Sequence, residues 1–454
     1  MSINKVINDG YCIGCGACAY KRNDVHMGWN KYGMLQPIGS IDDLDDYVCP
    51  FSTTDNESTI ADSLFSNTSN IKFDNKVGYH QALLAGYVKD NNYRDNASSG
   101  GITSWLLVQL MSKKLIDGVI HVGKSDKTDE LFSYSISNTL DDIKNKTRSQ
   151  YYPTSFSDAL TEVDVHKKYA IVGIPCYIKA VRLLCKKDAL LKEAIKFFIG
   201  IFCGHLKTKA FAELLAWQQG IPPRKLKEIN FRVKNSNGLA SRYNIKVTSV
   251  DDDIKMEQTG HLYGTDWGLG LFKPKACEWC DDIAAETADV VFGDAWLPQY
   301  VSDPKGTNIV ISRNNIITNI LNSARKNGEL VLDDISVDDV IRAQAGNYRH
   351  RQEGLMVRIE DADLKNIWHP KKREFLLQST DDTTRRQIYM TRNFISGESH
   401  KLFFAAKEKE SLFFFFINMF RHDLKYRALT KNLVKNTIKM IYFCTNYLKK
   451  KWMK

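Results

Sequence analysis

The chain has 454 residues, of which 43% are hydrophobic and 26% are charged. This length and composition predict two or three domains with sizeable cores, and they exclude an intrinsically disordered chain. The N-terminus lacks the apolar run of a signal peptide, and the longest apolar run, residues 412–420, is about half as long as a membrane-spanning helix. We therefore expect a cytoplasmic protein whose ten cysteines bind metal or serve redox chemistry rather than form disulfides.

The net charge of +10 is unevenly distributed along the chain. Residues 401–454 contain thirteen Lys or Arg against three Asp or Glu, a difference of ten, so the rest of the chain is close to neutral. The basic character therefore belongs to a C-terminal segment and not to the body of the protein. Because the sequence contains no nucleic-acid recognition module, nucleic acid is not an expected partner.

The first cysteine group consists of Cys12, Cys15 and Cys18, spaced C-x2-C-x2-C, and Cys49, which is followed by a proline. Thiolates at this spacing wrap one 4Fe–4S cube, glycines between them leave backbone N–H groups free for the sulfurs, and a distant Cys-Pro completes the ligands, as in bacterial ferredoxins. Where a two-cluster ferredoxin has a further cysteine, this chain has Arg22, so the group predicts one cluster. The alternative, a zinc knuckle, usually has two separated C-x2-C pairs or added histidines.

A second group of cysteines lies at predicted strand ends and turns. Cys176 follows a β-branched run at the start of an amphipathic helix, a position that favours a thiolate, and Cys203 ends another strand-like run. Cys277 and Cys280 form a C-x2-C pair, which is a ready-made pair of metal ligands. On spacing alone, Cys176 and Cys203 also fit buried small hydrophobic residues. That interpretation is adopted for the two remaining cysteines, Cys185 and Cys444.

Several segments between residues 90 and 315 resemble the coenzyme F420 hydrogenase/dehydrogenase beta-subunit family. In chain order they are NASSGGITSWLL, GVIHVG, RSQYYPTS, AIVGIPCYIKAVRLL, GIFCGH, CEWCDDIAAETADVVFGDAW and GTNIVISR. The most specific are G-x-P-C before a basic amphipathic helix, and C-x2-C-x-D followed by A-D-x3-G-D. The resemblance does not extend to the C-terminal segment.

This resemblance implies an FAD-binding domain with a nearby 4Fe–4S cluster. It implies that the ligands of this second cluster are Cys176, Cys203, Cys277 and Cys280. With its N-terminal module, the chain resembles the family branch that includes plant 7-hydroxymethyl chlorophyll a reductase and members found in bacterial exopolysaccharide gene sets.

The flavin contacts are expected from three segments. The loop NASSGGIT precedes a predicted helix, whose N-terminus favours phosphate; on its own it reads equally as a capped helix start, and the resemblance favours a flavin loop. RSQYYPTS offers donors to pyrophosphate and isoalloxazine, and the aspartate after strand 289–292 either holds a ribose or flavin edge or caps a turn. The candidate cofactor-binding residues are Ser98, Ser99, Gly100, Gly101, Arg148, Ser149, Gln150, Tyr151, Gly293 and Asp294.

Two further observations concern the chemistry near this site. His205, just after Cys203, is a candidate catalytic proton donor, with a local hydrogen-bonding role as the alternative. No G-x-G-x-x-G follows a predicted strand, so a nicotinamide is not an expected cofactor.

The expected fold class is α+β / α/β: a small ferredoxin-like iron–sulfur module, an α/β flavin-binding body with an inserted β-hairpin, and a basic helical C-terminal tail. The expected boundaries are residues 1–52 for the module, 53–77 for a Ser/Asn/Thr-rich linker, 78–380 for the body and 381–454 for the tail. The alternating segments INFRVK and YNIKVTSV predict the hairpin. Strands are expected at 118–122, 169–174, 197–202, 289–292 and 308–312, and helices at 102–115, 208–218 and 315–326.

Two basic segments leave alternatives open. Residues 347–351 either face a substrate or flavin phosphate or form a solvated surface run. In the tail, the apolar run 412–420 is followed by lysines and aromatic residues as far as Trp452, which fits a helix at the inner membrane surface. Packing on the body or in a dimer is the equal alternative.

The main functional hypothesis is an oxidoreductase that passes electrons through two 4Fe–4S clusters to FAD and then to a small-molecule or sugar-type substrate. Ferredoxin or another redox protein is the expected electron donor, and a role in polysaccharide biosynthesis rests on family analogy. The alternative is an electron-transfer subunit for a partner hydrogenase or dehydrogenase, with coenzyme F420 or ferredoxin as redox partner. A third hypothesis, a zinc-bound scaffold at the membrane surface, leaves the family motifs unexplained.

Overall fold

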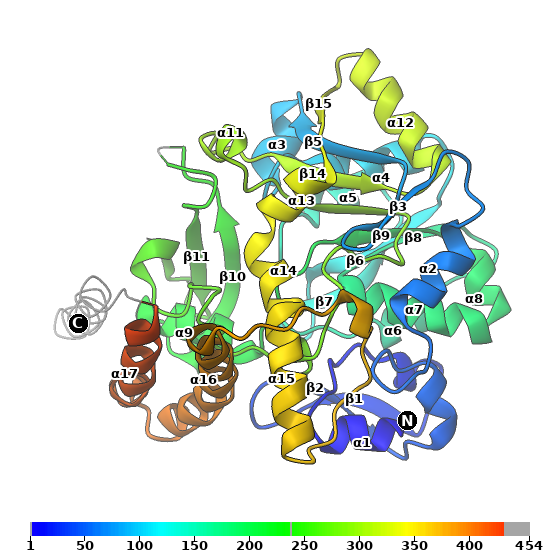
Figure 1. The fold of residues 1–454 in the computed structure, drawn as a ribbon. Helices are drawn as coiled ribbons and strands as arrows, with labels where there is room; N and C mark the ends of the chain where they lie inside the picture. The colour runs from blue at the N-terminus through cyan, green and yellow to red at the C-terminus, as the bar shows by residue number, and fades with distance from the viewer. Residues whose placement is uncertain (1, 237, 431–454) are drawn as a thin grey trace.

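The computed structural model describes residues 2–236 and 238–430. A large sheet with helices on both sides forms the body of the protein (Figure 1). A smaller sheet and the C-terminal helices lie to one side of the body, and the N-terminal residues pack below it in the view of Figure 1. The functional residues predicted from the sequence come from the body and from the N-terminal residues.

The large sheet has eight strands in the order β15-β5-β14-β13-β9-β8-β6-β7. The four neighbours β13, β9, β8 and β6 are parallel, and antiparallel strands complete the sheet on both sides. The strands are β5 Ala82–Val88, β6 Gly118–Lys124, β7 Phe132–Ser137, β8 Tyr169–Gly173, β9 Ile195–Ile201, β13 Val290–Asp294, β14 Asn308–Ser312 and β15 Leu330–Asp334. This mixed α/β body contains all five expected strands, and it adds β5, β7 and β15 to them.

Helices cover both faces of this sheet because apolar side chains alternate between the faces along each strand. On β6, for example, Val119 and Ile120 belong to different clusters of buried side chains. One face packs on α4 (Ile102–Ser112) and α12 (Asn315–Lys326), and the other on α7 (Pro175–Lys187). The other helices of the body are α3 Asn91–Asn96, α5 Leu140–Asn145, α6 Ser157–Thr161, α8 Ala189–Ala194, α10 Lys275–Glu278, α11 Pro298–Val301, α13 Val337–Ala343, α14 Ala345–Arg351, α15 Glu353–Leu364 and the short turn η5 Glu374–Leu376.

The predicted hairpin is present and has a third strand. β10 (Leu226–Val233), β11 (Asn244–Ser249) and β12 (Ile254–Gln258) form an antiparallel sheet, flanked by the turns η3 (Pro223–Lys225) and η4 (Thr259–His261). This sheet shares a buried core with α9 (Lys209–Gln218), another predicted helix, and with the C-terminal helices.

The apolar run of the tail packs on the body. α16 (Thr383–Glu408) and α17 (Leu412–Leu429) lie side by side, and Leu412, Phe415, Phe416 and Met419 are fully buried in the core shared with the small sheet. This supports packing for that part of the tail, although Phe413 remains exposed. Among the described residues, no helix is both long and apolar enough to cross a bilayer. The rest of the tail, with Cys444 and Trp452, lies outside the described residues.

The N-terminal residues form a small unit with its own two-stranded sheet. Its elements are α1 Ile3–Asn8, η1 Ala17–Ala19, β1 Val25–Trp29, β2 Leu35–Gly39 and η2 Asp43–Tyr47. The segment 53–77, expected to be a linker, instead contains α2 (Glu57–Phe65) and β3 (Lys72–Asp74), which pairs with β4 (Gly78–His80). The helix forms because Asn56 Oδ1 accepts from Thr59 N at 2.9 Å and because Ile60 and Phe65 are buried.

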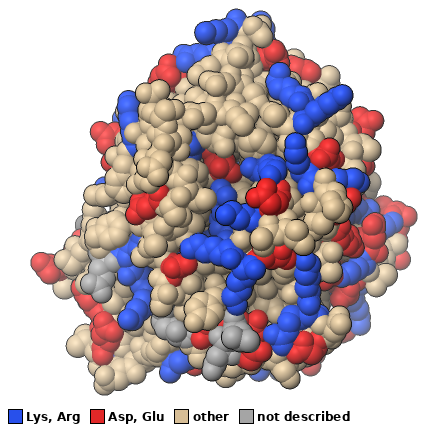
Figure 2. Space-filling model, turned by 90° about the vertical axis from the view of Figure 1, so that its right-hand side faces the viewer, with Lys and Arg blue, Asp and Glu red and all other residues tan. Residues whose placement is uncertain are grey.

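Charged side chains of both signs are interspersed over the face shown in Figure 2. Two exposed pairs join the N-terminal residues to the body: Lys21 to Asp188 at 2.9 Å, and Lys186 to Asp55 at 2.7 Å. Such pairs contribute only about 0–1 kcal/mol each. The position of the N-terminal unit must therefore depend on buried contacts.

His121, on β6, gives the fold a defined sensitivity to acid. Its side chain is buried with Nε2 2.9 Å from Ser137 Oγ, and burial lowers its pKa to about 3. An unfolded histidine titrates near pH 6.5, so only the unfolded chain gains this proton as the pH falls below about 6.5, and stability falls with it. Between pH 7.5 and pH 5.5 this proton uptake lowers the free energy of unfolding by about 1.4 kcal/mol, and we expect His121→Gln to abolish this part of the decrease. The urea unfolding midpoints of the variant and of the wild type at pH 7.5 and 5.5 measure this. If the midpoints of the two proteins differ by the same amount at both pH values, the prediction is wrong.

Candidate redox site

The four cysteines of the first group line one cavity in the N-terminal unit. Gly14 and Gly16 have φ values of +72° and +86°, which turn the chain around this cavity and let Gly14 N donate to Cys12 Sγ at 3.4 Å. A Cβ atom on Gly16 would overlap Ser155 Oγ of the body. None of the other residues that line this cavity has a charged side chain. The structure thus brings together the whole predicted set Cys12, Cys15, Cys18 and Cys49.

The cysteines of the second group line another cavity, although they are far apart in sequence. Cys176 is the second residue of α7, directly after β8, and Cys203 follows β9. Because β8 and β9 are parallel, their carboxyl ends lie at the same edge of the sheet, and the two cysteines meet there. Cys277 lies in α10 and Cys280 just beyond it, and Leu206 N donates to Cys277 Sγ at 3.3 Å.

The two cavities are neighbours. Ile13 and Phe51 each line both cavities. Tyr177, next to Cys176, donates its hydroxyl to the carbonyl of Ile13 at 3.2 Å and to that of Thr154 at 2.7 Å, which ties the second cavity to the loop of the first.

The donor set of each cavity fits a cluster better than a single ion. Nine cysteines in the described part of the chain are free of disulfides. Burial raises the pKa of Cys203 to about 11 and that of Cys277 to about 12, so these thiols are neutral until a metal displaces their protons. In the same part of the chain, no three His, Cys, Asp or Glu side chains are close enough to hold one metal ion. Four sulfurs spaced around a cavity match the ligands of a 4Fe–4S cube.

Two of the segments expected to bind flavin are in contact. Ser149 N donates to Ser98 Oγ at 2.7 Å, and Ser99 Oγ donates to the carbonyl of Thr307 at 2.9 Å. A Cβ atom on Gly100 would lie 2.5 Å from the carbonyl oxygen of Gly86, so only glycine fits there without displacement. The adjacent Gly101 has φ +83° and begins α4.

The other residues of the second segment lie beside this loop. Arg148, with φ +76°, donates from Nε to the carbonyl of Asn96 at 3.2 Å, and Gln150 Nε2 donates to the carbonyl of Thr147 at 3.3 Å. The Tyr151 ring packs against that of Trp267, with 4.9 Å between centroids.

Asp294 ends β13, and its carboxylate is held by an arginine that the sequence did not indicate. Arg232, on β10, reaches it with Nη1 at 2.7 Å and Nη2 at 3.3 Å. The guanidinium lies over the ring of Tyr243 at 4.8 Å from the centroid. Gly293 packs so tightly on Phe202 that a Cβ atom would overlap its ring. The small sheet therefore contributes to this region through Arg232.

The His205 side chain is half-buried beside the flavin candidates, with its Nε2 atom out of contact with solvent. Its ring centroid lies 4.5 Å from that of Trp267, and none of the described residues hydrogen-bonds its Nε2. Burial, with help from the charges of Lys207 and Lys273, lowers the pKa of His205 well below its ordinary value. The imidazole is therefore neutral, and only its neutral N–H can serve the predicted role of proton donor.

Comparison with known families places this chain among redox proteins. A family model described as the N-terminal part of the coenzyme F420 hydrogenase/dehydrogenase beta subunit matches residues 83–161, and the C-terminal model matches residues 166–338. The two matches cover more than half of the chain. The chain belongs to the coenzyme F420 hydrogenase/dehydrogenase beta-subunit family. The family match includes the second cysteine group, and it ends before Arg351.

Those relatives of this family member whose names state an activity are redox proteins. The chain is 25% identical over 248 residues to an uncharacterized protein of Methanocaldococcus jannaschii, covering 53% of this chain and 62% of that one. It is 22% identical over 239 residues to the coenzyme F420 hydrogenase subunit beta of Methanococcus voltae (50% and 79%), and 24% identical over 334 residues to the coenzyme F420-dependent sulfite reductase of M. jannaschii (68% and 45%). The chain thus spans less than two thirds of two of these relatives.

Among solved structures, a chain of the F420-reducing NiFe hydrogenase complex from Methanosarcina barkeri aligns with this family member. The TM-score is 0.49 at 16% identity, and the alignment covers 67% of this chain and 99% of that one.

Arg351 was predicted to face a phosphate or solvent, and it does neither of these. It is 1% exposed and lines the second cavity, where its Nη1 contacts Cys280 Sγ and donates to the carbonyl of Asp282 at 2.7 Å. Its Nη2 donates to the carbonyls of Cys203 and Gly204, each at 2.8 Å. No motif in the sequence marks this contact.

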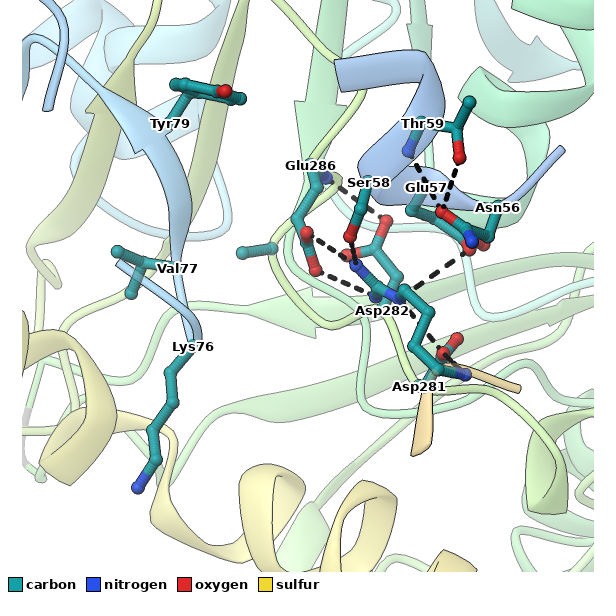
Figure 3. Close-up of polar contacts among 12 residues, drawn as sticks. Asn56, Glu57, Ser58, Thr59, Lys76, Val77, Tyr79, Asp281, Asp282 and Glu286 are labelled. Carbon is teal, nitrogen blue, oxygen red and sulfur yellow. Dashed lines mark hydrogen bonds and ion pairs between the residues drawn. The ribbon is translucent and has the colours of Figure 1, made fainter. Parts of the chain in front are cut away.

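Arg373, a further arginine that the sequence analysis did not single out, joins the two cysteine-bearing units. Arg373 Nε lies 3.1 Å from Asp281 Oδ2, and its two Nη atoms reach both oxygens of Glu286 at 2.7 and 2.9 Å. Nη1 also donates to Ser58 Oγ at 3.1 Å, on the helix that contains Glu57. Figure 3 shows these acidic residues converging from α2 and from the loop after Cys280. The closely spaced acidic residues of that loop are the one signal in the sequence that could have indicated a buried cation there.

Proposed function

We propose that this chain is an iron–sulfur flavoprotein oxidoreductase. In this proposal Cys12, Cys15, Cys18 and Cys49 hold one 4Fe–4S cluster, and Cys176, Cys203, Cys277 and Cys280 hold a second. FAD binds where the loop 96–101 meets residues 148–151. The clusters supply one-electron transfer and the flavin converts it to two-electron chemistry, while the chain sets their positions and potentials.

The observation that carries this proposal is the pair of neighbouring cavities, each lined by four cysteines. Membership of a family of redox subunits supports the same conclusion. The flavin part is supported by the contact between Ser98 and Ser149, which brings two of the expected flavin segments together beside the N-terminus of α4.

The alternative is an electron-transfer subunit that serves a partner hydrogenase or dehydrogenase, with coenzyme F420 or ferredoxin as redox partner. The name of one relative, the coenzyme F420 hydrogenase subunit beta of Methanococcus voltae, favours it. In the main proposal the electron donor is ferredoxin or another redox protein, and the substrate is a small molecule. The substrate is of the sugar type if the resemblance to the branch found in exopolysaccharide gene sets extends to activity. Reduction of a candidate small-molecule substrate by the purified chain and its electron donor, with no partner subunit present, would support the main proposal over this alternative.

Composition of the anaerobically purified full chain tests the proposal first. We expect a brown protein with about eight iron and eight sulfide per chain, as two 4Fe–4S cubes require, and one FAD. Iron, acid-labile sulfide and flavin assays with an ultraviolet–visible spectrum measure this. About four iron would remove the second cluster from the proposal, and a colourless protein containing zinc would overturn it in favour of a scaffold.

A further inference from the structure

Arg351 is a buried cation without a carboxylate partner. In the part of the chain that the structure describes, no Asp or Glu forms an ion pair with it, and its bonds go to three backbone carbonyls and to Cys280 Sγ. A buried charge is costly unless another charge compensates it. Here the groups available for that compensation are the sulfurs of the second cysteine group.

Of the three carboxylates within two residues of Cys277 or Cys280, two have cations of their own, and the third, Asp282, does not line the cavity and meets Arg351 through its backbone carbonyl. Glu278 contacts Lys273 Nζ and lies 3.4 Å from Arg358 Nε, and Asp281 pairs with Arg373 at 3.1 Å. Two cations meet Glu278, and two carboxylates, Asp281 and Glu286, meet Arg373, so these charges cancel when taken together and do not offset the guanidinium of Arg351. The second cavity therefore carries one positive charge that is directed at sulfur.

The first cavity has no such charge. The residues that line it include no charged side chain. Asp45, the acidic residue in η2 whose charge acts on Cys18, pairs with Arg22 at 3.0 Å. The linings of the two cavities thus differ in charge by one buried guanidinium.

On the basis of the proposed function, we propose that Arg351 raises the reduction potential of the cluster on the second cysteine group above that of the first, so that electrons run from the N-terminal unit towards the flavin. Reduction adds one negative charge to a cluster that is already anionic. A fixed guanidinium that donates to a ligand sulfur stabilises the added charge. Arg351 is in this sense a positioning and tuning residue.

The electron balance of this direction is simple. A one-electron redox protein gives an electron to the first cluster, which passes it to the second and is oxidised again. Two successive electrons leave the second cluster for FAD, and two protons from solvent complete its reduction. Because the transfer between the clusters runs to the higher potential, the return of electrons from the second cluster to the first is disfavoured.

A redox titration of the full, anaerobically purified chain, followed by electron paramagnetic resonance, tests this. Signals are assigned with Cys12→Ala, which removes the first cluster. In the wild type we expect the second cluster to be reduced at the higher potential. At a fixed potential, Arg351→Gln should lower the ratio of reduced to oxidised second cluster roughly tenfold, which is about 59 mV for one electron, and should leave the first cluster unchanged.

Two further variants complete the experiment. Arg351→Lys keeps the positive charge but lacks the planar guanidinium. We therefore expect it to lower the reduction potential of the second cluster by less than Arg351→Gln does. Arg349→Gln removes an exposed arginine from the same helix and should change neither potential. The inference is overturned if the wild-type second cluster has the lower potential, or if both Arg351 variants keep eight iron with an unchanged potential. A wild type without a second cluster would instead remove the proposed function.

Discussion

Replacing Arg373 with methionine is expected to destabilise the folded protein by about 3–5 kcal/mol. The guanidinium is 1% exposed and makes four polar contacts within 3.1 Å, to Asp281, to both oxygens of Glu286 and to Ser58. Removing one partner of a buried ion pair leaves the other charge desolvated and uncompensated, which costs more than the pair itself contributed. Here the substitution leaves two carboxylates in that state.

Matched variants identify the cause of the loss. Arg325→Met removes a half-exposed arginine that pairs with Asp334 at 2.9 Å, and we expect a change within about 0.5 kcal/mol. Adding Glu286→Gln to Arg373→Met should restore part of the lost stability, because it removes one of the unpaired charges. Urea unfolding followed by circular dichroism measures all three proteins. Equal losses for the two arginine variants would show that the buried cluster contributes little.

The same arginine links the two cysteine groups mechanically. Ser58 belongs to the helix that follows Cys49, and Asp281 directly follows Cys280. Figure 3 shows that this contact lies between α2 and the loop of the body. Since the exposed ion pairs at this junction are weak, the distance between the cavities depends on buried polar contacts, which include those of Arg373, the pair of Lys179 and Glu57 at 3.1 Å and the bond of Tyr177 to Ile13.

The parts of the site that local sequence patterns encode were predictable. Cys12, Cys15 and Cys18 lie within seven residues, so their spacing alone brings them to one cavity. Cys176 and Cys203 each end a β-branched run, and parallel strands bring such ends to one edge. The same local signal, a run of buried apolar residues between turns, predicted five strands of the large sheet.

Contacts over long sequence separations were not predictable from these patterns. Arg351 meets Cys280 across 71 positions, and Arg373 meets Ser58 across 315. An arginine has the same local signature whether it is solvated or buried on a sulfur, so the basic run 347–351 could not be assigned. The segment 53–77 was read as a linker from its polar composition, yet Ile60 and Phe65 are enough to bury one face of α2.

Removing one cysteine from either group should remove half of the iron. We expect Cys12→Ala and Cys277→Ala each to retain about four of about eight iron per chain, because a cube with three protein ligands is readily lost while the other cavity keeps all four. Cys185→Ala is the matched control. Cys185 is buried on the same helix as Cys176 but lines neither cavity, so this variant should keep about eight iron. Full iron content in Cys277→Ala, or a loss in Cys185→Ala, would contradict the assignment.

The same variants distinguish a serial from a parallel path of electrons. The two cavities share Ile13 and Phe51, and the expected flavin contacts lie in the body with the second cysteine group. In a serial path, both cysteine variants lose flavin reduction by a protein donor, although each keeps one cluster and its FAD. In a parallel path, Cys12→Ala would still reduce its flavin at a rate near that of the wild type. Stopped-flow absorbance of the flavin separates these outcomes, because dithionite, a small reductant, still reduces the flavin in every variant that binds it.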